Sequence, residues 1–281
     1  MATLTQLFIY PIKSCAGLAV DAAILRESGL VAQGVHDREW MLVTEQGQFL
    51  TQRETPRMAL VRPRPEGDTL RVAFPGMPDL ALPLAWDAAL QPRAVKIWDD
   101  IVDAADCGDA AAAWFGQALG LPCRLVRFRR EVVRPTSVKW TGGVPAQTRF
   151  SDGYPLLLMG QASLDDLNAR LAAAGRAALP MNRFRPNLVV DGIPAFEEDY
   201  LSALAFDTST VRPVKPCARC PIPAIDQDSA IAGPDPLDIL QTYRANPRME
   251  GAVCLGMNCI VVHGDGSELR VGQEFDPELG F

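Results

Sequence analysis

The chain has 281 residues, enough for one large domain or two of moderate size. Hydrophobic residues make up 48% of it and charged residues 22%, which is typical of an ordinary soluble globular protein. The net charge of −7 excludes a protein that binds nucleic acid over a broad basic surface, but it permits a local cationic pocket for a small anion.

The N-terminal stretch "MATLTQLFIYPIKS" lacks the basic start and long apolar run of a signal peptide. No stretch has about 18 uninterrupted apolar residues, so we expect no membrane span. The chain has seven cysteines, an odd number, and no export signal, which indicates free thiols in a reducing compartment. We therefore expect a cytoplasmic protein.

The first hundred residues alternate between apolar and polar positions and are broken by turn signals such as "EQGQ" and "PEGD". Regular short strands joined by tight turns favour a barrel or a sandwich. The pattern predicts strands within residues 6–12, 22–28, 38–45, 49–54, 58–64 and 70–75.

Two segments predict helices. The first covers 109–120, with Asp109 as its N-terminal cap and Gly120 at its end. The second covers 163–175, with a capping box formed by Ser163 and Asp166.

The rest of the chain predicts strands at 185–190 and 202–206, a short helix at 236–244 and a final hairpin at 258–275. Because there is no GxGxxG or Walker loop and helices do not alternate with strands, a doubly wound parallel sheet is not expected. We predict a mainly β fold with interspersed helices (α+β). We place a domain boundary near residue 130, giving domains 1–130 and 131–281.

The stretch "VRPVKPCARCPIP", residues 211–223, contains a CxxC motif formed by Cys217 and Cys220. In a redox pair the motif opens a helix whose N-terminus stabilises the thiolate. Pro221 and Pro223 disfavour such a helix.

A zinc or iron–sulfur site would need two further ligands. The chain has only two histidines, and Cys254 and Cys259 are the only cysteines downstream of the motif. Two alternatives remain: a purely structural pair of thiols, or one exposed thiolate beside Arg219 on a rigid proline-framed loop. Such a thiolate suits a soft or high-valent transition metal that another ligand already holds, but the residues alone do not select the metal.

Four motifs occur in order along nearly the whole chain: "YPIKSCAG", "RFRPN", "KPCARC" followed by "IDQD", and "LRVGQEF". Together they make the chain resemble MOSC-domain proteins of the two-part kind, similar to the mitochondrial amidoxime-reducing component and its bacterial relatives. The resemblance implies an N-terminal β-barrel-like domain followed by a MOSC β-barrel domain.

The resemblance also implies a molybdenum cofactor, a pterin dithiolene with a terminal phosphate, lying between the two halves. Cys220 matches the cysteine that ligates molybdenum and would be both the metal ligand and the catalytic residue. The positions that match cofactor-binding residues are Lys13, Ser14, Arg38, Gly153, Tyr154, Arg185, Asn187, Ala218 and Arg219. The cations among them suit a phosphate, and an asparagine amide offers a pterin edge both a donor and an acceptor.

The chain departs from the family pattern beside the expected metal. Ala218 stands where relatives often have a serine, and Pro223 and Ala224 stand where they often have a threonine pair. Substrate range is therefore more open than cofactor identity. Some bacterial relatives also carry a C-terminal ferredoxin domain, whose cysteine set does not follow "FDPELGF" here.

The resulting hypothesis is a molybdenum-cofactor oxidoreductase that reduces small N-hydroxylated compounds by two electrons. The electrons would come from a separate ferredoxin-like or cytochrome-like protein with its reductase. Two alternatives remain open. One is a sulfur carrier with a persulfide on Cys220, and the other is a non-catalytic protein that binds or stores the cofactor.

Overall fold

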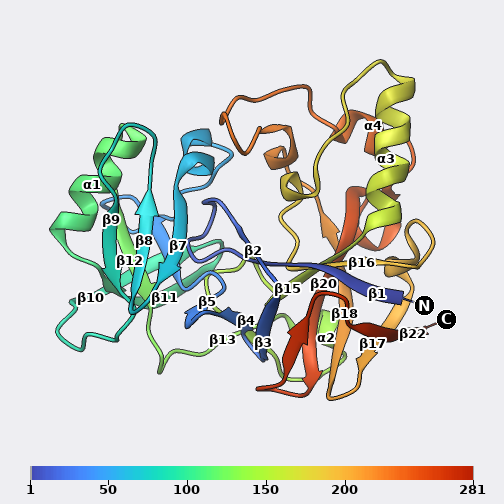
Figure 1. Cartoon of the computed structure of the whole chain (residues 1–281), viewed down its shortest axis with the longest axis horizontal. Coiled ribbons are helices and arrows are strands. Elements are labelled where there is room, and N and C mark those ends of the chain that lie inside the picture. The colour runs from blue at the N-terminus through green and yellow to red at the C-terminus, as the bar shows by residue number, and fades with distance from the viewer. Residues whose placement is uncertain (1, 281) are drawn as a thin grey trace.

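The computed structural model describes residues 2–280, and strands dominate it (Figure 1). One lobe holds a closed barrel of seven strands, in which the last strand of the series pairs back with the first. In order, these are β15 (Leu156–Gly160), β16 (Leu188–Asp191), β1 (Ala2–Ile9), β22 (Glu274–Leu279), β17 (Leu201–Phe206), β18 (Ser209–Ala218) and β20 (Ala252–His263). Two short strands extend this sheet, β2 (Leu18–Val20) beside β1 and β19 (Ala245–Asn246) beside β20.

The other lobe contains smaller antiparallel sheets and the helix α1 (Asp109–Leu119) (Figure 1). Its four-stranded sheet runs β10 (Pro92–Ile97), β11 (Asp100–Asp106), β12 (Arg124–Phe128) and β6 (Trp40–Val43). A three-stranded sheet is formed by β7 (Arg62–Glu66), β8 (Thr69–Ala73) and β9 (Leu80–Pro83). The predicted mainly β fold with interspersed helices is confirmed.

The two halves of the sequence are interleaved through strand pairing. β1, from the start of the chain, pairs with β16 and with β22, where Ala2 lies opposite Phe275. A separate four-stranded antiparallel sheet joins β21 (Glu268–Arg270), from the end of the chain, to β3 (Ala22–Arg26), β4 (Gly29–Ala32) and β5 (Val35–His36). The main hydrophobic core likewise takes residues from both ends of the chain. The domain boundary near residue 130 stays a prediction.

Three further short elements complete the barrel side of the chain. These are a two-stranded ribbon of β13 (Arg134–Pro135) and β14 (Gln147–Thr148), the single-turn helix α2 (Val138–Thr141), and α4 (Leu237–Gln241) in the predicted segment. No helix within residues 2–280 is long and apolar enough to cross a membrane.

The helix bounds differ from prediction at their N-termini. Gly108, not Asp109, is the cap of α1, whereas Gly120 ends it in the left-handed conformation as predicted. Helix α3 (Gln161–Ala173) begins before Ser163, so the predicted capping box is wrong. One backbone N–H at its start is instead satisfied from a distant segment, because the buried Glu198 carboxylate accepts from Gly160 N at 3.2 Å. The same carboxylate accepts from Ser163 Oγ at 2.7 Å.

Two strand predictions also fail. Residues 49–54 make only an isolated bridge, between Val43 and Phe49, and 58–64 begins as a 3₁₀ helix, Pro56–Leu60, before β7. The final hairpin does not form: β20 lies between β18 and β15, so both of its edges are already paired. The chain beyond it instead supplies β21 to β3 and β22 to β1 and β17.

Candidate functional site

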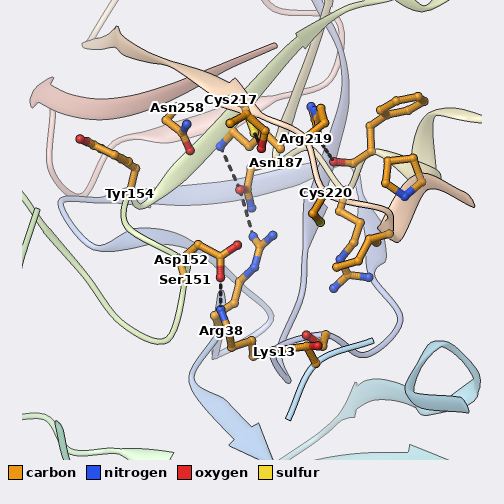
Figure 2. Close-up of a pocket in the computed structure, with 18 of the residues that line it drawn as sticks. Lys13, Arg38, Ser151, Asp152, Tyr154, Asn187, Cys217, Arg219, Cys220 and Asn258 are labelled. Atoms are coloured by element: carbon orange, nitrogen blue, oxygen red, sulfur yellow. Dashed lines mark hydrogen bonds and ion pairs between the residues drawn. The ribbon is translucent and has the colours of Figure 1, made fainter. Parts of the chain in front are cut away.

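A pocket with about 880 Å³ of empty space, part of it open to solvent, lies where the two halves of the sequence meet (Figure 2). One acidic side chain lines it, Asp152, against six basic ones: Lys13, Arg38, Arg53, Arg183, Arg185 and Arg219. The protein as a whole has a net charge of −7, so the pocket is positively charged although the protein is acidic. Like charges held together cost free energy unless an anion offsets them.

Lys13 follows β1, and its backbone N donates to Trp40 O at 2.8 Å. Its Nζ donates to Asp152 Oδ1 at 2.5 Å (Figure 2). The Lys13 side chain is only 7% exposed, whereas that of Asp152 is 72% exposed at the pocket mouth. Desolvation lowers the pKa of Lys13, and the Asp152 carboxylate only partly opposes this.

Arg38 lies in the turn between β5 and β6 with φ at 46°, a conformation that non-glycine residues seldom adopt. Its Nη1 donates to Asp37 Oδ2 at 2.6 Å. It also donates to Asn187 Oδ1 at 3.0 Å (Figure 2). Asn187 also donates from Nδ2 to Phe8 O at 3.1 Å. The amide of Asn187 therefore fixes Arg38 and strand β1, so much of its hydrogen-bonding capacity is already used by the protein.

Arg185 is buried, with φ at 57°. Its guanidinium carbon lies 4.4 Å from the centre of the Tyr10 ring, which Arg38 also contacts at 4.2 Å. Its one side-chain hydrogen bond is long, 3.5 Å from Nη1 to Gln227 Oε1, and it forms no ion pair within residues 2–280. Desolvation lowers the pKa of Arg185, and the charge of Arg38 acts in the same direction. A buried guanidinium without a carboxylate partner favours an anionic ligand.

The two cysteines of the CxxC motif both line the pocket, but they lie in different kinds of secondary structure. Cys217 belongs to strand β18, which runs to Ala218 despite two prolines, with register irregularities beside both of them. Only Cys220 lies in the loop that follows β18. As predicted, no α-helix starts at the motif.

Two arginines brace the loop that carries Cys220. Arg183 donates to Pro223 O at 3.2 Å and to Ala224 O at 3.0 Å, and it pairs with Asp226 at 2.7 Å. Arg219 donates from Nε to Leu255 O and from Nη1 to Phe184 O, both at 2.8 Å. These bonds turn the guanidinium of Arg219 toward the backbone, where it fixes the loop against neighbouring segments.

The geometry gives no support to a redox pair of cysteines or to a zinc or iron–sulfur site. All seven cysteines are free, and Cys254 and Cys259 are buried along β20. Among the described residues, no three histidine, cysteine or acidic side chains are grouped so that they could hold a metal ion. Burial raises the pKa of the Cys217 thiol, which suits a packing role for that residue.

Nearly all the residues that the sequence predicted as a site lie along this one pocket. The lining includes Lys13, Ser14, Arg38, Tyr154, Arg185, Asn187, Ala218, Arg219 and Cys220. Gly153 is not part of the lining, although its neighbours on both sides are. Sequence reasoning missed Arg183, which stands inside the quoted motif "RFRPN", and Ser151 and Asp152, which directly precede the predicted Gly153. It also missed Thr51 and Arg53, which no motif marked.

The donors of the pocket fit a polar anionic ligand. The buried hydroxyl oxygens of Thr51 and Ser151 have no hydrogen-bond partner within residues 2–280, and both residues line the pocket. A buried hydroxyl without a partner costs free energy, which a hydrogen bond to a ligand in the pocket would offset. The structure thus defines a class: a two-lobed β protein that holds a partly exposed thiol in a pocket rich in basic side chains, between segments of both sequence halves.

Comparison with known proteins agrees with this class. Residues 1–122 match the MOSC N-terminal beta barrel domain and residues 145–276 match the MOSC domain. The chain is 34% identical to mitochondrial amidoxime reducing component 2 of Bos taurus, over 87% of this chain and 73% of that protein. For components 2 and 1 of Homo sapiens the identities are 35% and 32%, over 87% of this chain in each case and 73% and 72% of those proteins. The chain belongs to the family of MOSC-domain proteins that includes the amidoxime-reducing components.

Proposed function

We propose that the chain is a molybdenum-cofactor-dependent oxidoreductase that reduces N-hydroxylated compounds, with the cofactor held between its two halves. The observation that carries this proposal is the pocket itself, where the partly exposed Cys220 thiol and cations from separate parts of the chain line one cavity. The names of the relatives support amidoximes as the substrate class.

The residues present fit such a cofactor. Cys220 would ligate the metal, since its loop is fixed on both sides by arginine contacts to backbone oxygens. Lys13, Arg38 and Arg185 would hold the terminal phosphate, and the unpaired hydroxyls beside them would satisfy further acceptors. The bound cofactor would supply the two-electron redox chemistry, while the protein positions and tunes it.

The overall reaction also needs protons and an electron source. An amidoxime that takes up two electrons and two protons gives an amidine and one water, and the N–O bond is the bond that breaks. The pocket opens to solvent beside Asp152, which gives a small substrate and a proton-carrying water a route in. A separate ferredoxin-like or cytochrome-like protein with its reductase would provide the electrons.

The test is metal and turnover analysis of protein made in a host that synthesises the cofactor. We expect about one molybdenum per chain, and reduction of an aromatic amidoxime with a chemical reductant. Molybdenum without turnover would favour a storage protein. A persulfide on Cys220 without molybdenum would favour a sulfur carrier, and stoichiometric zinc would overturn the proposal.

A further inference from the structure

A second cavity lies on the other side of the segment His36–Glu39 and shares no lining residue with the first. It is walled by the β4–β5 turn, β12 and the chain around β14. Four arginines line it (Arg26, Arg127, Arg130 and Arg149) against three acids (Glu27, Glu39 and Asp265). It is therefore another site of positive excess in an acidic protein, and the proposed function does not use it.

Two of the acids at this cavity are already engaged at its rim. Asp265 pairs with Arg26 at 3.1 Å and also accepts from Glu27 N at 3.0 Å. Glu27 accepts from Gln147 Nε2 at 3.2 Å. Glu39 is therefore the acid of this cavity that remains to offset the charges of Arg127, Arg130 and Arg149.

Glu39 is buried and is shared by two arginines. Arg127 Nε donates to Glu39 Oε1 at 2.7 Å, and the rest of its guanidinium bonds to the carbonyl oxygens of residues 83–85. Arg149 reaches only Glu39 Oε2, at 3.3 Å. Arg130 is exposed and forms no ion pair within the described residues. Desolvation lowers the pKa of Arg149, and the charges of Arg127 and Arg130 act in the same direction against Glu39.

The remaining polar group of the cavity is uncharged. Ser28 Oγ and His36 Nε2 lie 3.0 Å apart, and His36 Nδ1 lies 3.2 Å from Asp37 O, so we assign the Nδ1-protonated tautomer. Burial lowers the pKa of His36 to about 3, so the ring is neutral at neutral pH. The cavity thus offers two incompletely paired guanidinium groups beside a neutral imidazole.

We propose that this second cavity binds a phosphate group through Arg130 and Arg149, with Arg127 and Glu39 holding Arg149 in place. A guanidinium presents a planar fork of donors that matches the oxygens of a phosphate, and such charge-assisted bonds are the stronger kind. A bound dianion would offset the positive excess that Glu39 leaves uncompensated. The site is independent of the first pocket, because the two cavities have no lining residue in common.

The test is titration calorimetry of the full chain with inorganic phosphate, against chloride at equal ionic strength. We expect phosphate to bind and Arg130→Gln to weaken it at least about tenfold, the effect of one lost charge-assisted contact. Arg130 makes no hydrogen bond or ion pair in the described chain, so this variant should fold normally. Arg149→Lys, which keeps the charge but loses the fork, should also weaken binding. Arg248→Gln, an exposed arginine outside both cavities, is the matched control and should bind as the wild type does.

Three results would overturn the proposal. They are no phosphate binding beyond that in chloride, full affinity in Arg130→Gln, or binding that Arg185→Gln abolishes while Arg130→Gln spares. The last would place the phosphate in the first pocket. Titration with a simple phosphate monoester separates the sources: tighter binding than inorganic phosphate assigns the site to a larger phosphorylated molecule, and weaker binding assigns it to free phosphate. Arg130 and Arg149 line only the second cavity, so the effect of their substitution on phosphate binding tests this proposal separately from the proposed function.

Discussion

Replacing Asn187 by alanine should destabilise the protein strongly and displace Arg38. The amide is only 1% exposed. Its Oδ1 accepts from Arg38 Nη1 at 3.0 Å and from Leu157 N at 3.2 Å, and its Nδ2 donates to Phe8 O at 3.1 Å. At about 1 kcal/mol for each neutral hydrogen bond and about 2 kcal/mol for the charged one, the loss should be about 4 kcal/mol.

Urea unfolding of the purified protein measures this loss, with Asn258→Ala as the matched control. Asn258 lines the same pocket, but its Nδ2 makes only long contacts, 3.3 Å to Lys215 O and 3.5 Å to Pro216 O, so its removal should cost about 1 kcal/mol or less. A double-mutant cycle with Arg38→Gln should give a coupling of about 1.5 kcal/mol or more. Equal losses from the two asparagine variants, or no coupling to Arg38, would refute the reasoning.

Three further predictions concern the cysteines, a histidine and a glycine. Cys217→Ala should keep most of its amidoxime turnover, whereas Cys220→Ala should lose turnover but still bind the pterin through its phosphate and ring contacts; equal loss of turnover in the two variants, or full activity in Cys220→Ala, would contradict the assignment of Cys220 as the ligand. Burial lowers the pKa of His36 to about 3. The contribution of His36 to the free energy of unfolding is therefore complete above about pH 6.5 and is lost as pH falls. Wild type should therefore lose about 2 kcal/mol between pH 7.5 and 5.0 relative to His36→Gln in urea unfolding, and parallel pH profiles would exclude this role. Gly256→Ala should destabilise by more than about 2 kcal/mol, because at φ +75° its Cβ would lie 2.5 Å from Leu158 O and 3.3 Å from Arg219 Nη2. Gly251→Ala, at φ +82° in open space, should cost only about 1 kcal/mol, and equal thermal shifts for the two glycine variants would remove the packing argument.

Local patterns predicted which segments are extended, but not how they pair. The alternation at 22–28 predicted β3, and turns lie at the predicted signals "EQGQ" and "PEGD". The turn after His263 is also real, yet it leads to other sheets, because β18 and β15 occupy both edges of β20. Similarly, no pattern near residue 163 could reveal that Glu198, about 35 residues downstream, satisfies the start of α3. Strand pairing and long-range caps depend on tertiary contacts. The hydrophobic period of a strand (two residues) or of a helix (3.6 residues) does not encode such contacts.

The site was more predictable than the pairing, since residue chemistry and motif order both pointed to it. Lys13, Arg38 and Arg185 are far apart in sequence, and the structure brings them to one pocket. The role of each hydrogen-bond donor was harder to predict from the sequence. Asn187 and Arg219 form their side-chain hydrogen bonds with other parts of the protein. Arg183, in the motif "RFRPN", donates to the backbone of the loop that carries Cys220. Only the geometry separates a side chain that presents donors to a ligand from one that holds its neighbour.

The pocket is built from both halves of the sequence. Lys13 and Arg38 come from the first half, and Arg185 and Cys220 from the second, so neither half alone carries the complete set. Strand β1 is hydrogen-bonded into the barrel by β16 and β22, and Lys13 lies four residues beyond its end. This short tether fixes the Lys13 ammonium relative to the barrel without a long loop, whose closure would cost more entropy. The interleaved topology therefore positions cations of the first half beside the thiol of the second.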